Sequence, residues 1–380
     1  MPYVKIPHDS ANGVVRLRYN VHGLGPRKVV LISGMCVPST MWIPQINALC
    51  SNFQSFSQKN DDEKAVREVG KYSVLTLDNR GVGGSTSIIP RDGASVPVME
   101  TLRGYSTLQM AHDVWEVVDA VGWKAEEVAL VGHSMGGMVA QRMAYLRPQQ
   151  VRMLGLLATH AGGWFDWWPS WSMLRGLGRA LWNRFDKAAV THVNLDWHYS
   201  ERYLEEVVRK ETENGIIIKR RDAYFERYMG TVVEDFEQMQ VSDDNKEQRK
   251  EDVDSEEEEV EKVAVSAEKE SAGSLLGHLK AAFGHKLEEE EARILRMCRK
   301  IRTIVMYGRD DGVIASSSSQ TLANFLEADR EVEVEGRHFI ADESQHKINQ
   351  VLIEELDKSF EPLDCKCESC VPVVSEDESE

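Results

Sequence analysis

The apolar positions fall into two patterns that alternate along the first 160 residues of the chain. Helical spacing, with an apolar residue at every third or fourth position, occupies residues 108–121 and 135–147. Short continuous apolar runs, typical of β-strands that are buried on both faces of a parallel sheet, occupy residues 28–32, 72–77, 128–131 and 151–158. This alternation predicts an α/β fold with a mainly parallel, doubly wound sheet.

The alternation stops after His160 and resumes near residue 301. The later part predicts strands at 301–307 and 331–335 and helices at 317–326 and 343–359. The intervening segment has mainly helical patterns and no strand–helix alternation. We therefore predict a core formed by residues 1–160 and 301–360, which is interrupted by a helical cap at 161–300.

The charge of the chain is concentrated in two segments. Hydrophobic residues make up 42% and charged residues 28% of the 380 positions, as in an ordinary globular protein. The net charge is −17, of which residues 241–270 carry −8 and residues 361–380 carry −6. Such runs predict a disordered acidic insertion in the cap at 241–270 and a disordered acidic tail at 361–380. The negative balance predicts that the protein does not bind nucleic acid.

The lack of a recognisable targeting signal and the scattered cysteines predict an intracellular protein whose cysteines are reduced. No apolar stretch resembles a signal peptide or reaches the roughly 18 residues of a membrane span, so the expected location is cytoplasmic. Six scattered cysteines do not form a disulfide framework. Cys365, Cys367 and Cys370 are either incidental thiols or zinc ligands, and a structural zinc site needs a fourth ligand. We expect no metal, no cofactor and no obligate protein partner.

The candidate nucleophile is Ser134. It lies at the centre of Gly132-His133-Ser134-Met135-Gly136-Gly137, a G-x-S-x-G sequence between a predicted strand and a predicted helix. A sharp turn at this place holds the serine in a strained conformation and projects its hydroxyl, and the glycines leave room for the turn. The start of the next helix offers free N–H groups to a developing oxyanion.

A serine nucleophile needs a base and an acid that orients the base. His338 follows the strand predicted at 331–335, and Asp310 and Asp311 follow the strand predicted at 301–307. The carboxyl ends of parallel strands meet at one edge of the sheet, where a doubly wound fold has its active site. The sequence therefore predicts a serine–histidine–aspartate triad, with one of the two aspartates as the acid and the other as a cap or salt link of the loop.

Three further histidines have other interpretations. His346 falls inside the last predicted helix, where we expect it to be exposed to solvent. His133 precedes the nucleophile and is expected to point away from it and to pack beneath the turn. His160 ends a strand near the active edge and is a candidate for substrate contact.

These motifs resemble those of α/β hydrolases with a helical cap, and they are similar to a branch found in plants and protists. The resemblance covers about residues 14–240 and 275–356. The matching segments are Leu31-Ile32-Ser33-Gly34-Met35, Trp42-Ile43-Pro44-Gln45-Ile46, Asp78-Asn79-Arg80-Gly81-Val82-Gly83, Gly132-His133-Ser134-Met135-Gly136-Gly137, His198-Tyr199-Ser200 and Gly308-Arg309-Asp310-Asp311.

The resemblance implies roles for several of these residues. The acid is the fourth residue of the Gly-x-x-Asp loop, which selects Asp311. The oxyanion hole is formed by the backbone N–H groups of Met35 and Met135. Many members have His-Gly where this chain has Ser33-Gly34, a departure that changes the support of the hole but not its main-chain donor. Asn79 and Arg80 are interpreted as scaffold.

The predicted function is that of a serine hydrolase that cleaves a carboxylic ester through Ser134, His338 and Asp311. A serine nucleophile argues against epoxide hydrolase or dehalogenase chemistry, which uses a carboxylate in this family. Acyl transfer or thioester cleavage by the same triad is an alternative, and so is a binding protein that keeps the fold without catalysis.

The start of the predicted cap is rich in tryptophan, with Trp164, Trp167, Trp168 and Trp171 within eight residues. These rings pack the cap onto the core, form an apolar acyl pocket, or lie on a peripheral membrane surface. Under the second interpretation, Trp164 and Trp168, together with His160, would contact an apolar ester or acyl substrate.

Overall fold

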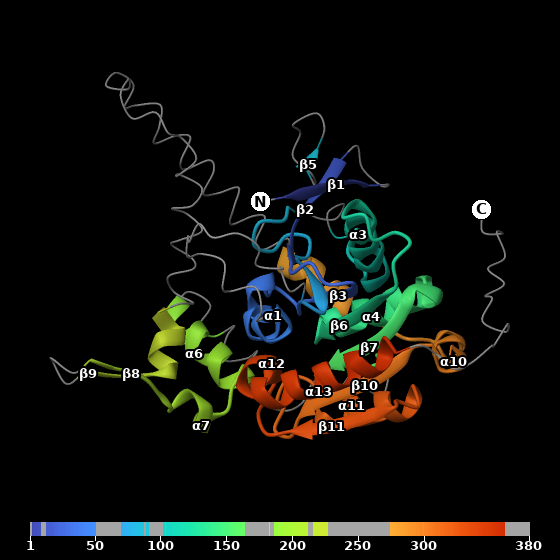
Figure 1. Ribbon diagram of the computed structural model, residues 1–380. Helices are drawn as coiled ribbons and strands as arrows, with labels where there is room; N and C mark the ends of the chain where they lie inside the picture. The colour runs from blue at the N-terminus through green and yellow to red at the C-terminus, as the bar shows by residue number, and fades with distance from the viewer. Residues whose placement is uncertain are drawn as a thin grey trace, which may run out of the picture.

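The computed structural model contains one large sheet with helices on both of its faces (Figure 1). The structure describes residues 2–8, 13–50, 70–86, 89–90, 102, 104–163, 182, 186–211, 216–226, 274–298 and 300–361. Within these ranges, no helix combines the length and the apolar character that a bilayer span requires.

The large sheet has the strand order β1-β2-β4-β3-β6-β7-β10-β11, and β5 pairs with β2. All pairs from β4 to β11 are parallel, whereas β1, β2 and β5 make antiparallel pairs at one edge. The strands are β1 (Tyr3–His8), β2 (Gly13–His22), β3 (Arg27–Ile32), β4 (Tyr72–Leu77), β5 (Ile89–Pro90), β6 (Val128–His133), β7 (Val151–Leu157), β10 (Arg302–Gly308) and β11 (Arg330–Val334). The predicted doubly wound, mainly parallel sheet is confirmed.

Two layers of helices cover the sheet. One layer consists of α3 (Thr107–Ala120), α4 (Met135–Leu146), α10 (Glu289–Met297) and α11 (Ser316–Phe325), with η3 (Pro148–Gln150) after α4. The other consists of η1 (Ser39–Trp42), α1 (Ile43–Cys50), α12 (Ile340–Glu343) and α13 (Gln345–Ser359).

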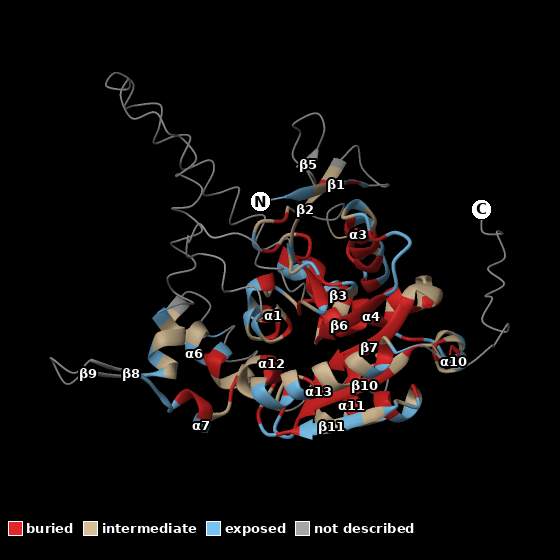
Figure 2. Cartoon of the chain, in the orientation of Figure 1, coloured by how far each residue is buried: buried red, intermediate tan, exposed pale blue. Residues whose placement is uncertain are grey.

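Burial on both faces explains the continuous apolar runs of the strands. In β3, Val30 and Ile32 pack into the first layer, whereas Val29 and Leu31 pack into the second. Successive side chains of a strand point to opposite faces, so every position of such a strand must be apolar. The buried residues in Figure 2 accordingly follow the central strands.

The segment between β7 and α10 differs from the helical expectation. It contains α6 (Lys187–His198), α7 (Glu201–Leu204) and a helix at residues 274–283, but also the antiparallel hairpin of β8 (Val207–Glu211) and β9 (Ile216–Lys219). Runs of valine and isoleucine in both strands account for this difference, because β-branched residues favour extended backbone. The predicted acidic insertion and, apart from Glu361, the predicted acidic tail lie outside the described residues.

Candidate active site

Ser134 occupies the turn between β6 and α4 in a strained conformation, with φ 55° and ψ −124°. Its N–H donates to the carbonyl oxygen of Leu157 at 2.8 Å, and its own carbonyl accepts from the Thr159 hydroxyl at 2.8 Å. The Ser134 carbonyl also accepts the N–H of Gly137 at 2.9 Å, which closes the turn. These bonds on both sides of the residue hold the backbone in its strained conformation.

The glycines beside Ser134 are needed because three segments of backbone meet there. A Cβ atom on Gly132 would lie 2.2 Å from the carbonyl oxygen of Gly136. A Cβ atom on Gly136 would lie 2.1 Å from the carbonyl oxygen of Ile32. Any side chain at these positions would push β3, β6 and α4 apart and displace the serine between them.

His338 connects Ser134 to Asp311. Its Nε2 atom lies 2.9 Å from the Ser134 hydroxyl oxygen, and its Nδ1 atom lies 2.8 Å from Oδ2 of Asp311. The ionised carboxylate only accepts, so Nδ1 donates to it and Nε2 presents its lone pair to the serine. This tautomer is the one in which the imidazole acts as a general base toward the hydroxyl.

The two candidate aspartates have different surroundings. Asp311 is buried, and its Oδ1 atom accepts the N–H groups of Val313 at 2.8 Å and Ile314 at 3.0 Å. Asp310 is exposed, and its N–H donates to the carbonyl of Gly336. The geometry therefore brings Asp311, and not Asp310, to His338.

The two expected oxyanion donors lie next to the serine. Met135 is the first residue of α4, where a main-chain N–H has no acceptor within the helix. Met35 follows Gly34, which packs so closely that a Cβ atom on it would lie 3.2 Å from Cβ of Ser134. At the position where many α/β hydrolases have histidine, the Ser33 carbonyl accepts from the Asn79 amide at 2.9 Å.

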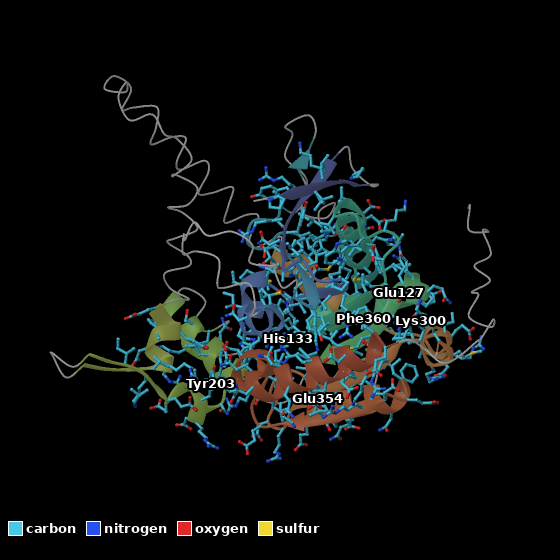
Figure 3. All side chains as sticks on the ribbon, in the orientation of Figure 1. Glu127, His133, Tyr203, Lys300, Glu354 and Phe360 are labelled. Atoms are coloured by element: carbon cyan, nitrogen blue, oxygen red, sulfur yellow. The ribbon has the colours of Figure 1, made fainter. Side chains whose placement is uncertain are left out.

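The other histidines have separate surroundings. His133 lies in the interior (Figure 3), and its Nε2 atom donates to the carbonyl of His338 at 2.8 Å. Burial and the neighbouring His338 lower the pKa of His133 well below the usual value, so its ring is a neutral support under the catalytic loop. His346 is exposed on α13, as expected.

Among the expected substrate contacts, only His160 falls within the described residues. Its Nδ1 atom accepts the N–H of Gly162 at 2.8 Å, and burial lowers its pKa to about 4. Among described residues, none of its hydrogen bonds reaches the Ser134 site. Trp164 and Trp168 lie outside the described residues, so their expected contacts stay predictions.

Comparison with known proteins identifies the fold. Residues 28–192 match the family model described as the alpha/beta hydrolase fold. A thermophilic esterase from Thermogutta terrifontis superposes with a TM-score of 0.55 and 18% identity over 94% of this chain and 99% of that chain. The enol-lactonase from Burkholderia xenovorans gives 0.55 and 19% over 94% and 100%. The chain has the α/β-hydrolase fold.

Curated relatives match only part of this chain. The putative carbamate hydrolase RutD of Azorhizobium caulinodans is 29% identical over 165 residues, which are 43% of this chain and 45% of the relative. RutD of Variovorax paradoxus is 30% identical over 142 residues, or 37% and 41%. The chain thus spans less than half the length of these relatives.

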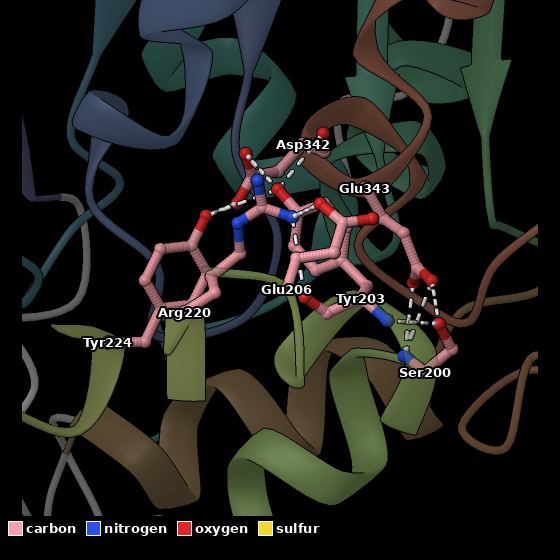
Figure 4. Close-up of polar contacts among 7 residues, drawn as sticks. All are labelled: Ser200, Tyr203, Glu206, Arg220, Tyr224, Asp342 and Glu343. Atoms are coloured by element: carbon pink, nitrogen blue, oxygen red, sulfur yellow. Dashed lines mark hydrogen bonds and ion pairs between the residues drawn. The ribbon is translucent and has the colours of Figure 1, made fainter. Parts of the chain in front are cut away.

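The loop of His338 and the helix α12 that follows it are bound to the inserted segment. The Asp342 carboxylate accepts the hydroxyl groups of Tyr224 at 2.6 Å, Tyr199 at 3.0 Å and Tyr203 at 3.2 Å. Burial and the Asp342 charge raise the pKa of Tyr203 to about 12, so its hydroxyl stays a donor. Figure 4 shows Tyr203 and Tyr224 converging on Asp342.

Further bonds hold the same loop on either side of the histidine. The Glu343 carboxylate accepts the N–H of Arg337 at 3.0 Å and also the main-chain N–H of Ser200 at 3.2 Å and its hydroxyl. The N–H of Phe339 donates to the carbonyl of His198 at 3.0 Å. Sequence reasoning missed Asp342 and Glu343, although it singled out residues 198–200 as a family-like segment without giving it a role.

We predict that Tyr224→Phe loosens this attachment. The variant loses a hydrogen bond to a charged group, which contributes about 1.5–3 kcal/mol, so opening of the loop becomes roughly ten times more frequent or more. Hydrogen exchange measured by mass spectrometry should show faster exchange in peptides that contain Phe339. Tyr72→Phe is the matched control, because it removes a tyrosine–aspartate bond of 2.7 Å that does not involve this loop. Equal protection of the Phe339 amide in both variants would contradict the prediction.

Proposed function

We propose that the chain is a serine hydrolase that cleaves a carboxylic ester through an acyl-enzyme on Ser134. The observation that carries the proposal is the unbroken series of hydrogen bonds from Ser134 through His338 to Asp311. The strained turn at Ser134 and the adjacent loop of Met35 support it. The matched hydrolases are consistent with hydrolysis as the type of reaction.

In this mechanism, the Ser134 hydroxyl oxygen attacks the ester carbonyl while Nε2 of His338 takes its proton. The N–H groups of Met35 and Met135 donate to the oxyanion of the tetrahedral intermediate. Asp311 keeps the proton of Nδ1 in place and stabilises the imidazolium. His338 then gives its proton to the departing alkoxide, and the alcohol leaves. A water molecule, deprotonated by His338, attacks the acyl-enzyme and releases the acid and Ser134.

We further propose an apolar acyl group on the substrate. The rings around His338 are those of His133, His198 and Phe339, whose centroids lie 4.8 Å, 5.7 Å and 6.0 Å from its own. Burial and the proximity of His338 lower the pKa of His198 to about 4, so this ring adds no charge at neutral pH. Uncharged rings around the base favour an apolar ligand.

A fluorophosphonate probe tests the proposal directly, because it reacts only with an activated serine. We expect the native chain to be labelled and Ser134→Ala to stay unlabelled. Ser317→Ala is the matched control: Ser317 is exposed on α11 and its main-chain carbonyl, which accepts from the Thr321 hydroxyl, is kept in alanine, so this variant should label like the native chain. A folded native chain that does not react would overturn the proposal and favour a binding protein without catalysis.

The substrate class follows from a panel of nitrophenyl esters with increasing acyl length. A rise of kcat/KM with chain length is expected for an apolar acyl pocket, and a flat or falling profile would contradict it. A thioester and a carbamate belong in the panel, the second because the curated relatives are called putative carbamate hydrolases. Adding an alcohol as acceptor separates hydrolysis from acyl transfer, which would yield a new ester.

A further inference from the structure

A buried histidine of the inserted segment contacts the loop after β3. We propose that His278 is a positioning residue for the oxyanion hole, because it holds the N–H of Cys36, the residue after Met35. The inference rests on the proposed function, since Met35 has this role only if Ser134 is acylated. His278 lies in the helix at residues 274–283, far from Cys36 in the sequence.

The hydrogen bonds of His278 define one tautomer. Its Nδ1 atom lies 3.0 Å from the main-chain nitrogen of Cys36, and its Nε2 atom lies 3.0 Å from the carbonyl oxygen of Arg80. A main-chain N–H only donates and a carbonyl only accepts, so Nδ1 accepts and Nε2 carries the proton. Burial lowers the pKa of His278 to about 4, which keeps the ring neutral and both bonds intact at neutral pH.

The loop after β3 needs such an anchor. Cys36 has a φ of 56°, in the left-handed region that is costly for a residue with a side chain. The turn bond of this loop, from the N–H of Val37 to the carbonyl of Gly34, is long at 3.4 Å. The N–H of Met35, which would donate to the oxyanion, belongs to the Gly34–Met35 peptide group. The N–H of Cys36, which His278 holds, belongs to the next peptide group, and the two groups share the Cα atom of Met35. Fixing the N–H of Cys36 therefore restricts the orientation of the N–H of Met35.

On its other side, His278 is bonded to the turn after β4, which is held by further hydrogen bonds. The Arg80 carbonyl that receives Nε2 also lies 3.3 Å from the Tyr105 hydroxyl, which donates to it. One residue later, the carbonyl of Gly81 accepts from the Ser274 hydroxyl at 2.7 Å. The helix at 274–283 is thus bonded to two successive carbonyls of the turn after β4, and His278 extends from this base to the oxyanion loop.

A cysteine–histidine nucleophile is the competing interpretation of the same pair. Sγ of Cys36 lies 3.6 Å from Nδ1 of His278. The Cys36 side chain is exposed, however, and its sulfur is farther from Nδ1 than the main-chain nitrogen of the same residue, which lies at 3.0 Å. The Nδ1 lone pair is already directed to the main-chain N–H. These observations favour a positioning role for His278 over activation of the thiol.

Two substitutions separate the bonds of His278. Asparagine places a carbonyl oxygen near the position of Nδ1 and retains an acceptor for Cys36. Glutamine places an amide N–H near the position of Nε2 and retains a donor for Arg80, but it leaves Cys36 without an acceptor. We expect His278→Gln to lower kcat by about tenfold to 100-fold, somewhat less than the loss of a whole oxyanion donor, with KM changed by less than about twofold. His278→Asn should keep kcat within about threefold of the native value.

A trifluoromethyl ketone supplies a readout that a merely structural role would not change. Its adduct with Ser134 carries an oxyanion, so its affinity should fall in His278→Gln in proportion to kcat and stay near native in His278→Asn. Equal losses of kcat and affinity in the two variants would overturn the inference. So would rapid hydrogen exchange of the Cys36 amide in the native chain, a measurement that needs no variant to fold.

The failure of this inference differs from the failure of the proposed function. If the native chain does not react with the fluorophosphonate, the assignment of Ser134 is wrong and the oxyanion role falls with it. If the native chain reacts and the two His278 variants behave alike, only the role of His278 is wrong.

Discussion

Asp311→Asn is expected to lower kcat/KM for an activated ester by about 10⁴-fold. The carboxylate of Asp311 accepts the proton-bearing Nδ1 of His338 at 2.8 Å, and this bond keeps Nε2 free to accept the serine proton. The substitution keeps the size of the side chain and removes its charge. The expected loss therefore reflects which ring nitrogen of His338 carries the proton and not a change in packing.

The surroundings of Asp311 fix how an asparagine would lie. The N–H groups of Val313 and Ile314 both donate to Oδ1, a position that an amide NH₂ group cannot occupy. The amide oxygen must take this place, so the NH₂ group faces Nδ1 of His338. Nδ1 then has to accept, and the ring proton moves to Nε2. In that tautomer, His338 has no lone pair for the Ser134 hydroxyl.

Asp310→Asn is the matched control, because it makes the same change one residue away on an exposed side chain. Its kcat/KM should stay within about twofold of the native value. Steady-state kinetics with one nitrophenyl ester measure all three chains. Equal losses in the two variants would mean that the charge of the loop matters and the bond to His338 does not. A loss below about tenfold for Asp311→Asn would show that activity does not depend on which ring nitrogen of His338 carries the proton.

The positions of the three candidate catalytic residues at one edge of the sheet could be predicted from the sequence. Ser134, Asp311 and His338 each follow an apolar run, and parallel strands bring their carboxyl ends to one edge. A strand that is buried on both faces has a continuous run of apolar residues, which is easily recognised in the sequence, as in residues 28–32 of β3. The choice of Asp311 over Asp310 needed the family resemblance, and the structure explains it through the burial of one side chain and the exposure of the other.

Contacts between distant segments left no comparable signal. The bond between His278 and Cys36 joins positions 242 residues apart, and neither position belongs to a recognisable motif. Of the three tyrosines that donate to Asp342, Tyr199 and Tyr203 are near each other in the sequence, but Tyr224 and Asp342 join them only in the folded chain. The hairpin of β8 and β9 was missed for a different reason, because helical patterns on both sides outweighed two short β-branched runs.

Asp113→Leu is expected to cost about 3–5 kcal/mol in the free energy of unfolding, with a fall in the melting temperature on the order of 10 °C. Asp113 on α3 makes a two-pronged bond to the Arg80 guanidinium, with both N···O distances 2.7 Å. The Arg80 side chain is 1% exposed. A third bond from the guanidinium, to the carbonyl of Gly104, would remain in the variant. The loss of Asp113 therefore leaves a buried positive charge with one neutral acceptor.

The double variant Arg80→Met/Asp113→Leu separates the cost of this charge from the loss of packing. Replacing both partners by apolar side chains of similar volume removes the unpaired charge, so we expect most of the lost free energy to return. Chemical denaturation of the native, single and double variants measures this, and a double variant no more stable than the single one would show that packing dominates. The backbone carbonyl of Arg80 survives in the double variant and still accepts from His278.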